Sequence, residues 1–330
     1  MKTLLVGYKA ADLTPELLEG DVTCHVLDIY HRHAIEKVHH AKVVCSAHLP
    51  EGPWDLIKFK TGPKLMSGEL SLDLLQEISQ LLRSGEDAAS PLSKDRRFHL
   101  EFVGKERDRN DLLDKIRDDP NRVRSFKAEW PASVPGGEKL MFTSYPGCFC
   151  HRRLDEGGLA LAEVVTREMM NEEFRMKNGG GVSLLDMGCG CGLVGFLIAN
   201  RLKQAKTLNS QLLTLNLTLV DSHTRAVEAA MENAAKFGAD AEVILSDNGT
   251  PSRMDGTFDV FVGNPPYYSD YRIAEVFLET ANRALKPDGI CYTVVKNAAG
   301  LKPVQERYFP SVEVIPRRGY SVLKSVNRKG

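Results

Sequence analysis

A glycine-rich turn preceded by an acid is the first feature of the sequence that points to chemistry. Asp186 lies near the end of the apolar run 182–187, and Gly188-Cys189-Gly190-Cys191-Gly192 follows at once. Glycines tolerate positive φ and let a ligand lie directly against the backbone. The helix expected next offers unpaired N–H groups at its start. The turn therefore predicts a cofactor-binding loop, with a tight structural turn as the alternative.

The same turn also fits the dinucleotide-binding pattern, as Gly190-x-Gly192-x-x-Gly195. Asp186 argues against a dinucleotide, because its carboxylate lies two residues before the first glycine. At that place it would repel a pyrophosphate, whereas it would pair with an ammonium group. We therefore expect the amino-acid end of a ligand, not a phosphate, beside Asp186.

Acids also end the next two strands of the expected sheet. Asp221 closes the strand at 212–220, and its two carboxylate oxygens suit the two hydroxyls of a ribose. The alternative for Asp221 is a helix N-cap, a role that Ser222 would fill as well. Asp247, followed by Asn248, comes after the third strand and is a candidate acceptor for an adenine amine. A turn-forming role is the alternative for this pair.

A rigid loop follows the fourth strand, expected at 258–262. Its sequence is Asn264-Pro265-Pro266-Tyr267. Two prolines fix φ and remove two backbone donors, which leaves rigid carbonyl acceptors. The Asn264 side-chain oxygen and the Pro265 carbonyl would together accept both hydrogens of one exocyclic amine and aim its lone pair at an electrophile. Tyr267 would stack on a planar base; a rigid turn with a buried aromatic is the alternative.

These motifs need a scaffold that brings them to one edge. In the second half, strands alternate with helices of 10–15 residues, which predicts a mostly parallel sheet with helices on both faces. In such sheets ligands bind at the carboxyl ends of the strands. The expected strands are 182–187, 212–220, 241–245, 258–262 and 290–295, the helices 193–202, 224–237 and 273–285, and an antiparallel hairpin is expected at 312–315 and 320–326.

The first half also has an α/β pattern, but no glycine-rich loop follows any of its strands. Its expected strands are 3–6, 22–27, 42–45, 55–59 and 98–103, with a helix at 70–82. Prolines and glycines near 128–145 predict a linker there. We therefore expect two domains, residues 1–130 and residues 131–330.

The two loops carry a family resemblance. The second half resembles class I S-adenosylmethionine-dependent methyltransferases of the methyltransferase small domain (MTS) family, with 186–192 as the cofactor loop and 264–267 as the catalytic loop of amino-group methylases. Tyr145-Pro146-Gly147-Cys148-Phe149, followed by Leu154-Asp155-x-Gly157, is similar to the segment that opens the catalytic domain in ribosomal RNA guanine-N2 methyltransferases of the small-subunit type C and the large-subunit type G.

The resemblance implies a fold, a cofactor and a set of site residues. The fold would be a Rossmann-like seven-stranded methyltransferase domain preceded by a degenerate α/β methyltransferase-like domain, which would serve RNA recognition and folding support. The cofactor would be S-adenosylmethionine, and the product a methylated guanine N2 in ribosomal RNA. The cofactor-binding residues would be Asp186, Gly188, Cys189, Gly190, Asp221, Ser222, Asp247, Asn248 and Asn264, and the catalytic residues Asn264, Pro265, Pro266 and Tyr267.

Tyr267 departs from the pattern of the guanine enzymes, which typically have Phe at this place. Tyr is familiar in adenine-N6 and protein-glutamine N5 methyltransferases. Methylation of one of these amines is therefore an alternative within the enzyme class. A non-catalytic RNA-binding assembly factor that retains the fold is an alternative from another class.

Charge and composition limit the partners. The chain of 330 residues has 43 Lys and Arg against 44 Asp and Glu, a formal net charge of −1. Bulk charge therefore does not hold RNA, and local basic patches would have to. Candidates are Lys94-Asp95-Arg96-Arg97, residues 105–109, Arg122 with Arg124 and Lys127, and Arg317-Arg318 with Lys324, Arg328 and Lys329. We expect ribosomal RNA or a ribosomal subunit as the partner.

Cysteines and hydropathy complete the expectations. Seven cysteines are an odd number without the spacing of a disulfide framework. Cys45-Ser46-Ala47-His48 is only half of a zinc pattern, so no metal site is expected. No apolar run approaches the roughly 18–20 residues that span a bilayer. We therefore expect a cytoplasmic protein without membrane contact.

Overall fold

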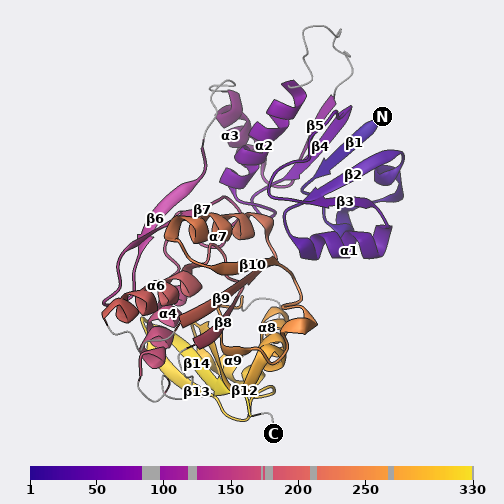
Figure 1. Ribbon diagram of the computed structural model, residues 1–330. Helices are drawn as coiled ribbons and strands as arrows, with labels where there is room; N and C mark the ends of the chain where they lie inside the picture. Colours follow the sequence, from indigo (N-terminus) through magenta and orange to yellow (C-terminus); the bar gives the residue numbers. More distant parts are fainter. Residues whose placement is uncertain are drawn as a thin grey trace. The chain divides into compact units, whose positions relative to one another are not determined.

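The structure is a computed structural model that describes residues 1–83, 97–117, 125–171, 174, 181–208, 214–266 and 271–328. The chain forms two compact units (Figure 1). Unit 1 comprises Met1–Lys127 with the short segments Tyr145–Gly147 and His223–Arg225. Unit 2 comprises Ala128–Ser144, Cys148–Ser222 and Ala226–Gly330.

Unit 1 is built on a five-stranded parallel sheet with the order β3-β2-β1-β4-β5. This confirms the α/β expectation for the first half. Its elements are β1 (Lys2–Val6), η1 (Ala10–Asp12), η2 (Pro15–Leu18), β2 (Asp21–Val26), α1 (Ile29–His39), β3 (Lys42–Cys45), β4 (Leu56–Thr61), α2 (Gly68–Arg83), β5 (Arg97–Phe102) and α3 (Glu106–Arg117).

Both faces of this sheet are buried, because side chains alternate along a strand. Leu4 and Val6 of β1 pack in a cluster with Leu74 of α2. Leu5, between them, packs in a second cluster with Ile35 of α1. The sheet of unit 1 is therefore covered by helices on both sides.

Unit 2 begins with a hairpin where the sequence predicts a linker. β6 (Ala128–Ala132) and β7 (Leu140–Ser144) pair antiparallel. Trp130 stacks on Phe142 with ring centroids 5.3 Å apart, and Phe142 meets Phe237 edge to face at 5.1 Å. The prediction of a linker near 128–145 is therefore wrong. The buried–exposed alternation in β6, with Pro131 at an exposed position, is the strand signal that the prolines obscured.

The main sheet of unit 2 has seven strands in the order β10-β9-β8-β11-β12-β14-β13. This confirms the expected seven-stranded Rossmann-like sheet. Its elements are α4 (Glu156–Met169), β8 (Gly181–Met187), α6 (Leu193–Leu208), β9 (Thr214–Asp221), α7 (Thr224–Phe237), β10 (Ala241–Leu245), η3 (Ser252–Met254), β11 (Phe258–Gly263), α8 (Arg272–Ala284), β12 (Leu285–Val295), α9 (Ala298–Gln305), β13 (Glu313–Arg317) and β14 (Tyr320–Val326).

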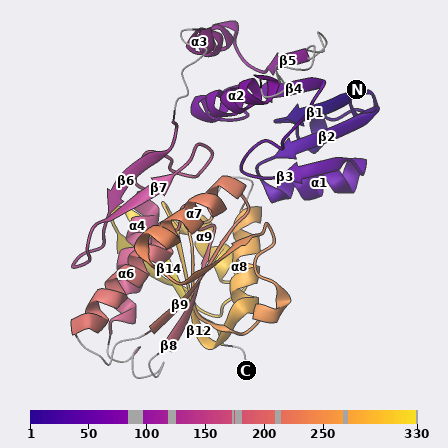
Figure 2. The ribbon, with the colours of Figure 1, turned by 45° about the horizontal axis from the view of Figure 1, so that its top comes forward.

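Helices cover both faces of this sheet (Figures 1 and 2). α4, α6 and α7 lie on one face, and α8 and α9 lie on the other. Burial on both faces explains why β8 and β11 read as continuous apolar runs instead of alternating ones. β14 pairs antiparallel with both β12 and β13, so the expected C-terminal hairpin is also confirmed.

The position of β8 determines where a ligand would bind. β9 and β10 extend the sheet on one side of β8, while β11 and β12 extend it on the other. The chain therefore reverses its strand order at β8, and open α/β sheets bind ligands in the crevice at such a switch point. The loops after β8, β9, β10 and β11 all leave the sheet at this one carboxyl edge.

Several sequence predictions fall outside the described residues. Tyr267 is one of them, together with Arg122 and Arg124 and most of the cluster Lys94–Arg97. Among the helices that the structure describes, none is long and apolar enough to cross a membrane.

Candidate active site

The glycine turn after β8 adopts the backbone that its sequence suggests. Gly188, Gly190 and Gly192 have φ values of +68°, +56° and +84°, a region that residues with side chains rarely adopt. A Cβ at Gly188 would lie 2.6 Å from Phe277, and one at Gly192 would lie 2.3 Å from Phe196. At Gly190 a Cβ would meet no described atom within 4 Å. The middle of the turn thus presents bare backbone to open space.

Asp186 is buried beneath this turn. It is 2% exposed, and its Oδ2 accepts a hydrogen bond of 2.9 Å from the backbone N–H of Gly195. The pKa of Asp186 is raised to about 7, mainly by burial and in smaller part by the negative charges of Asp221 and Asp155, against the lowering effect of the Gly195 N–H. A cation placed here would favour the ionised carboxylate.

Asp221 supports the turn from the neighbouring strand. Its Oδ2 accepts a hydrogen bond of 2.8 Å from the backbone N–H of Gly190. The N–H groups of Gly188 and Cys189 both donate to the carbonyl of Val220, at 2.8 and 3.0 Å. Asp221 therefore fixes the glycine loop directly. Its predicted contact with a ribose would come in addition, and Ser222 follows it at the same edge.

Asp247 and Asn248 lie at the same edge, after β10. The backbone N–H of Ser246 donates to the Asp221 carbonyl at 2.9 Å, which joins this loop to the end of β9. The Ser246 hydroxyl donates to Asn248 Oδ1 at 2.9 Å, and the Asn248 N–H donates to Ser246 Oγ at 3.4 Å. Asn248 thus forms a local turn, while Asp247 is half-buried beside it.

The Asn-Pro-Pro loop begins beside the glycine turn. β11 is in register with β8, with Val262 opposite Asp186 and Gly263 opposite Met187. Because neighbouring strands lie about 4.8 Å apart, Asn264 and Gly188 leave the sheet side by side. Pro265 is buried and Pro266 half-buried. Tyr267 lies outside the described residues.

A second carboxylate holds the side chain of Asn264. Asn264 Nδ2 donates a 2.8 Å hydrogen bond to Asp155 Oδ2, which leaves Asn264 Oδ1 on the other side of the amide. Asp155 is also the N-cap of α4, because its Oδ1 accepts from the Gly157 N–H at 3.0 Å. A Cβ at Gly158 would lie 2.5 Å from Asp155 Oδ2, so only glycine leaves room for this arrangement.

Sequence reasoning gave Asp155 no role in the site. The signal was present, since Asp155-Glu156-Gly157-Gly158 is an N-cap residue followed by two residues without side chains. The pattern does not identify the hydrogen-bond partner of Asp155, which is Asn264, 109 residues further along the chain.

The cysteines of the turn are buried and protonated. Burial raises the pKa of the Cys189 thiol well above its ordinary value, and it does the same for Cys191. Thiols in this state are poor nucleophiles and poor metal ligands. Within the described part of the chain, no three His, Cys, Asp or Glu side chains group as metal ligands would. Cys189 and Cys191 therefore serve as small buried residues of the turn.

The sheet order and the two adjoining loops define a Rossmann-like α/β domain of the methyltransferase class. A model of the family described as the methyltransferase small domain matches residues 139–324, which is more than half of the chain. The chain therefore belongs to this family.

Several curated relatives have the name ribosomal RNA small subunit methyltransferase C. The chain is 28% identical to the protein of Stutzerimonas stutzeri over 194 residues, which cover 57% of this chain and 51% of the relative. It is 31% identical to that of Pseudomonas aeruginosa over 176 residues, with coverage of 52% and 46%. The chain spans about half of the length of these relatives. A match to a Marinomonas protein, at 25% identity, covers 76% of this chain and 70% of the relative.

One solved structure resembles nearly the whole chain. It is a 16S rRNA N2 methyltransferase of T. thermophilus in complex with AdoMet and guanosine. The TM-score is 0.71 with 16% sequence identity, and the match covers 99% of this chain and 88% of the other. At this identity the likeness concerns the fold, including the presence of both units.

Proposed function

We propose that this chain transfers a methyl group from S-adenosylmethionine to an exocyclic amine, namely N2 of a guanine in ribosomal RNA. One observation carries the proposal: Asn264, with its amide held by Asp155, leaves the sheet next to the open glycine turn that follows Asp186. A cofactor resting on that turn and an amine held by Asn264 would therefore meet.

The residues present fit this cofactor. Three carboxylates, Asp155, Asp186 and Asp221, lie close enough for the other two to raise the pKa of Asp186. Such a site would repel a pyrophosphate and attract a cation. S-adenosylmethionine has an ammonium and a sulfonium group, so its charge complements the cluster. The bare backbone at Gly190 gives it room to lie.

The chain's own residues would act by positioning. Asp155 accepts from Asn264 Nδ2, which directs Asn264 Oδ1 toward the incoming amine. Asn264 Oδ1 and the Pro265 carbonyl would each accept one hydrogen of that amine, so that its lone pair points at the methyl group. When bound, S-adenosylmethionine supplies an electrophilic methyl group and leaves as a neutral thioether. The amine then loses one proton to water, and alignment supplies most of the acceleration.

The choice of guanine N2 in ribosomal RNA is supported by the relatives. The curated relatives are named ribosomal RNA small subunit methyltransferase C, and the similar solved structure is an N2 methyltransferase with guanosine bound. The exocyclic amine of a paired guanine is inaccessible to an active site, so the base would be presented unpaired or flipped. The partner would be ribosomal RNA or a ribosomal subunit, and the activity would be cytoplasmic.

For the two regions we propose a division of labour. Residues 131–330 would form the catalytic domain, and residues 1–130 a degenerate domain for RNA recognition or structural support. The strand order of unit 1 and its lack of a glycine-rich turn among the described residues support this division.

Mass spectrometry of rRNA nucleosides and of tryptic peptides, from cells with and without this chain, tests the proposal. We expect loss of one N2-methylguanosine and restoration by the purified protein with S-adenosylmethionine. Tyr267 favours a second candidate, an adenine-N6 or protein-glutamine N5 methyltransferase. Loss of N6-methyladenosine or methylglutamine with intact N2-methylguanosine would favour that candidate. An intact chain that binds no S-adenosylmethionine by calorimetry would indicate a non-catalytic RNA-binding factor.

A further inference from the structure

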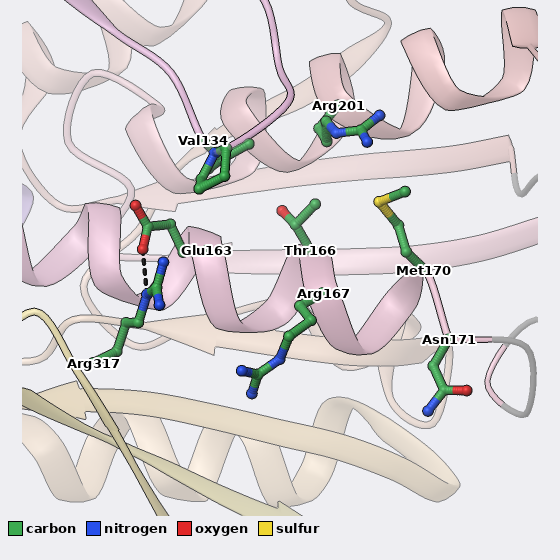
Figure 3. Close-up of a pocket in the computed structure, with 9 residues that line it drawn as sticks. Val134, Glu163, Thr166, Arg167, Met170, Asn171, Arg201 and Arg317 are labelled. Atoms are coloured by element: carbon green, nitrogen blue, oxygen red, sulfur yellow. Dashed lines mark hydrogen bonds and ion pairs between the residues drawn. The ribbon is translucent and has the colours of Figure 1, made fainter.

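Unit 2 contains a cavity of about 520 Å³ outside the candidate active site. It lies between the C-terminal half of α4, the middle of α6, the turn before β7 and the end of β13 (Figure 3). The residues that matter for its chemistry are Glu163, Thr166, Arg167, Asn171, Arg201 and Arg317.

The charge of this cavity is positive. Three arginines line it against one acid, Glu163. Glu163, whose side chain is 4% exposed, is already paired with Arg317 and with Arg318, the latter at 3.3 Å. Arg167 has only a loose contact of 3.6 Å with Glu168. For Arg201 the described residues provide no ion-pair partner. The excess charge therefore favours an anionic occupant.

Arg201 lies against the turn that precedes β7. Gly136 has a φ of +73°, and a Cβ there would lie 3.2 Å from Arg201 Nη2 and 3.3 Å from Arg201 Nε. A side chain at position 136 would thus crowd the guanidinium. The guanidinium of Arg201 therefore lies close against the backbone of this turn, at the lining of the cavity.

Thr166 supplies a second, independent sign of a ligand. It is 4% exposed, and its hydroxyl has no hydrogen-bond partner among the described residues. A threonine inside a helix ordinarily bonds to a carbonyl of the preceding turn, and an unsatisfied buried hydroxyl costs about 1–3 kcal/mol. Figure 3 shows its side chain directed toward the side of Val134 and Arg201. A ligand oxygen there would accept its proton.

The cavity is connected to the candidate active site by α4. Asp155, the N-cap of this helix, holds Asn264, and Arg318 pairs with Glu156 one residue later at 3.0 Å. At 1.5 Å per residue, Thr166 lies about 16 Å along the helix from Asp155. Phosphates in a helical strand follow each other at about 3.4 Å along the axis. A strand that runs alongside α4 would therefore span this distance with about five nucleotides or fewer.

We propose that this cavity holds the phosphodiester backbone of the RNA strand that presents the target amine, a proposal that rests on the proposed function. Arg201 and Arg167 would contact phosphate oxygens, and the Thr166 hydroxyl would donate to one of them. The arginines that line α4 then form a track leading away from Asn264.

Fluorescence anisotropy of the full chain tests this with a fluorescein-labelled, single-stranded 12-nucleotide RNA containing guanine, titrated at several KCl concentrations. We expect Arg201→Ala to weaken binding about 5–10-fold at low salt. The slope of log affinity against log salt should fall by about 0.7, the value for one phosphate contact of a single strand. Arg201→Lys should restore the slope. The matched control is Arg307→Ala, which removes an exposed arginine paired with Glu275 on α8, and it should change neither quantity.

Thr166→Val separates a ligand contact from a packing role. It removes the unpaired hydroxyl, so the melting temperature should stay the same or rise, while RNA affinity falls about 2–5-fold. A lower melting temperature with unchanged RNA affinity would contradict the proposal.

Calorimetry with S-adenosylmethionine distinguishes failure of this proposal from failure of the proposed function. If Arg201→Ala methylates RNA with unchanged affinity and salt slope, the cavity proposal is wrong while the function stands. If the chain binds no S-adenosylmethionine but Arg201→Ala still lowers the slope, the cavity stands while the function fails. Inorganic phosphate that binds in an Arg201-dependent way, without any effect of Arg201→Ala on RNA, would identify a free-phosphate site and overturn the proposal.

Discussion

The two units of this chain share a strand order but differ at the edge where chemistry occurs. In unit 1 the first strand is central, the second and third lie on one side, and the fourth and fifth on the other. The first five strands of the large sheet in unit 2 follow the same order. The first strand of that sheet, β8, leads into Gly188-Cys189-Gly190, whereas β1 of unit 1 leads into Gly7-Tyr8-Lys9.

The edge of unit 1 is filled by its own side chains. Tyr8 is buried, and its hydroxyl donates to Glu101 at 2.9 Å. Lys60 Nζ lies 2.9 Å from Asp12 and 3.0 Å from Glu101, and 5.5 Å from the centre of the Tyr8 ring. These four residues pair with one another where unit 2 exposes bare glycine backbone. The cluster is therefore structural.

The loops after the fourth strands differ in the same way. Thr61-Gly62-Pro63 follows the pattern of Gly263-Asn264-Pro265, with glycine in the place of asparagine. A Cβ at Gly62 would lie 2.0 Å from the Val103 carbonyl oxygen, so no side chain fits there. One topology thus supports a reactive edge in unit 2 and a closed edge in unit 1. Function depends on the residues at that edge and not on the fold itself.

The largest expected effect on methyl transfer comes from substitution of Asn264, whose counterpart in unit 1 is Gly62. Asn264→Ala removes an acceptor for the target amine, so methyl transfer should fall by about 10²–10³-fold, similar to the loss of one preorganised transition-state contact. Affinity for S-adenosylmethionine should change little. Radiolabelled methyl transfer and calorimetry measure the two quantities.

The matched control lies in the corresponding loop of unit 1. Pro63→Ala should leave methyl transfer within about twofold of the unmodified chain. Equal loss of cofactor binding and activity in Asn264→Ala would mean that the loop is structural, and the contrast between the two edges would then disappear.

Asp186→Asn tests whether the reactive edge recognises a cation. The amide oxygen can still accept from the Gly195 N–H, so only the charge is lost. A hydrogen bond to a charged group contributes about 1.5–3 kcal/mol, which predicts a 10–100-fold loss of S-adenosylmethionine affinity. Because the pKa of Asp186 is raised to about 7, affinity of the unmodified chain should rise with pH up to about 7 and then level off. The variant should show no such rise.

The same substitution has an opposite effect on stability. The pKa of Asp186 in the folded chain lies above its ordinary value of 3.8. The folded state therefore holds a proton that the unfolded state has lost between about pH 4 and 7, and stability falls as pH rises through this range. Asp186→Asn removes this pH-dependent loss of stability, so the melting temperature of the variant at pH 8 should exceed that of the unmodified chain. A difference in melting temperature between the two chains that is the same at pH 5 and at pH 8 would contradict this.

Much of unit 2 is predictable because its signals are local. The helix at 224–237 and the strands at 241–245 and 320–326 have the bounds that periodicity predicts. The glycine cluster predicts the turn after β8, where Gly188, Gly190 and Gly192 have positive φ, and the residue types after the fourth strand predict the rigid loop after β11. Each of these features is determined within about fifteen residues of sequence.

What sequence reasoning missed depends on distant contacts. Asp155 meets Asn264 across 109 positions, and Trp130 packs on Phe142 in a stretch whose prolines and glycines suggest a linker. Arg201 of α6 and Arg317 of β13 line the same cavity. No sequence motif links these two positions. Side-chain partners of this kind are fixed by the packing of helices on a sheet, which a single sequence does not reveal.

Asp155 orients the side chain of Asn264, and unit 1 has glycine at the position that corresponds to Asn264. Asp155→Ala removes both the acceptor of Asn264 Nδ2 and the cap of α4. We expect kcat to fall about tenfold, cofactor affinity to fall less than in Asp186→Asn, and stability to fall by about 1 kcal/mol from the lost cap. In Asp155→Asn the side-chain oxygen still caps the helix, but the NH2 group then faces Asn264 Nδ2. This variant should recover the melting temperature without recovering kcat; joint recovery would show that Asp155 is only a cap.

The smallest effect is expected at the closed edge. Lys60→Met leaves Asp12 and Glu101 without their shared cation, and because both acids are partly exposed the cost should be about 1–2 kcal/mol, less than for a fully buried pair. Calorimetry should show a lower melting temperature, and methyl transfer at low temperature should stay within about twofold. Lys58→Met is the control, since Lys58 lies two residues away on β4 and the described chain offers it no ion pair. If Lys60→Met instead abolished cofactor binding while the fold remained intact, the edge of unit 1 would have a functional role. Both edges would then take part in ligand binding, and the contrast between a reactive and a closed edge would fail.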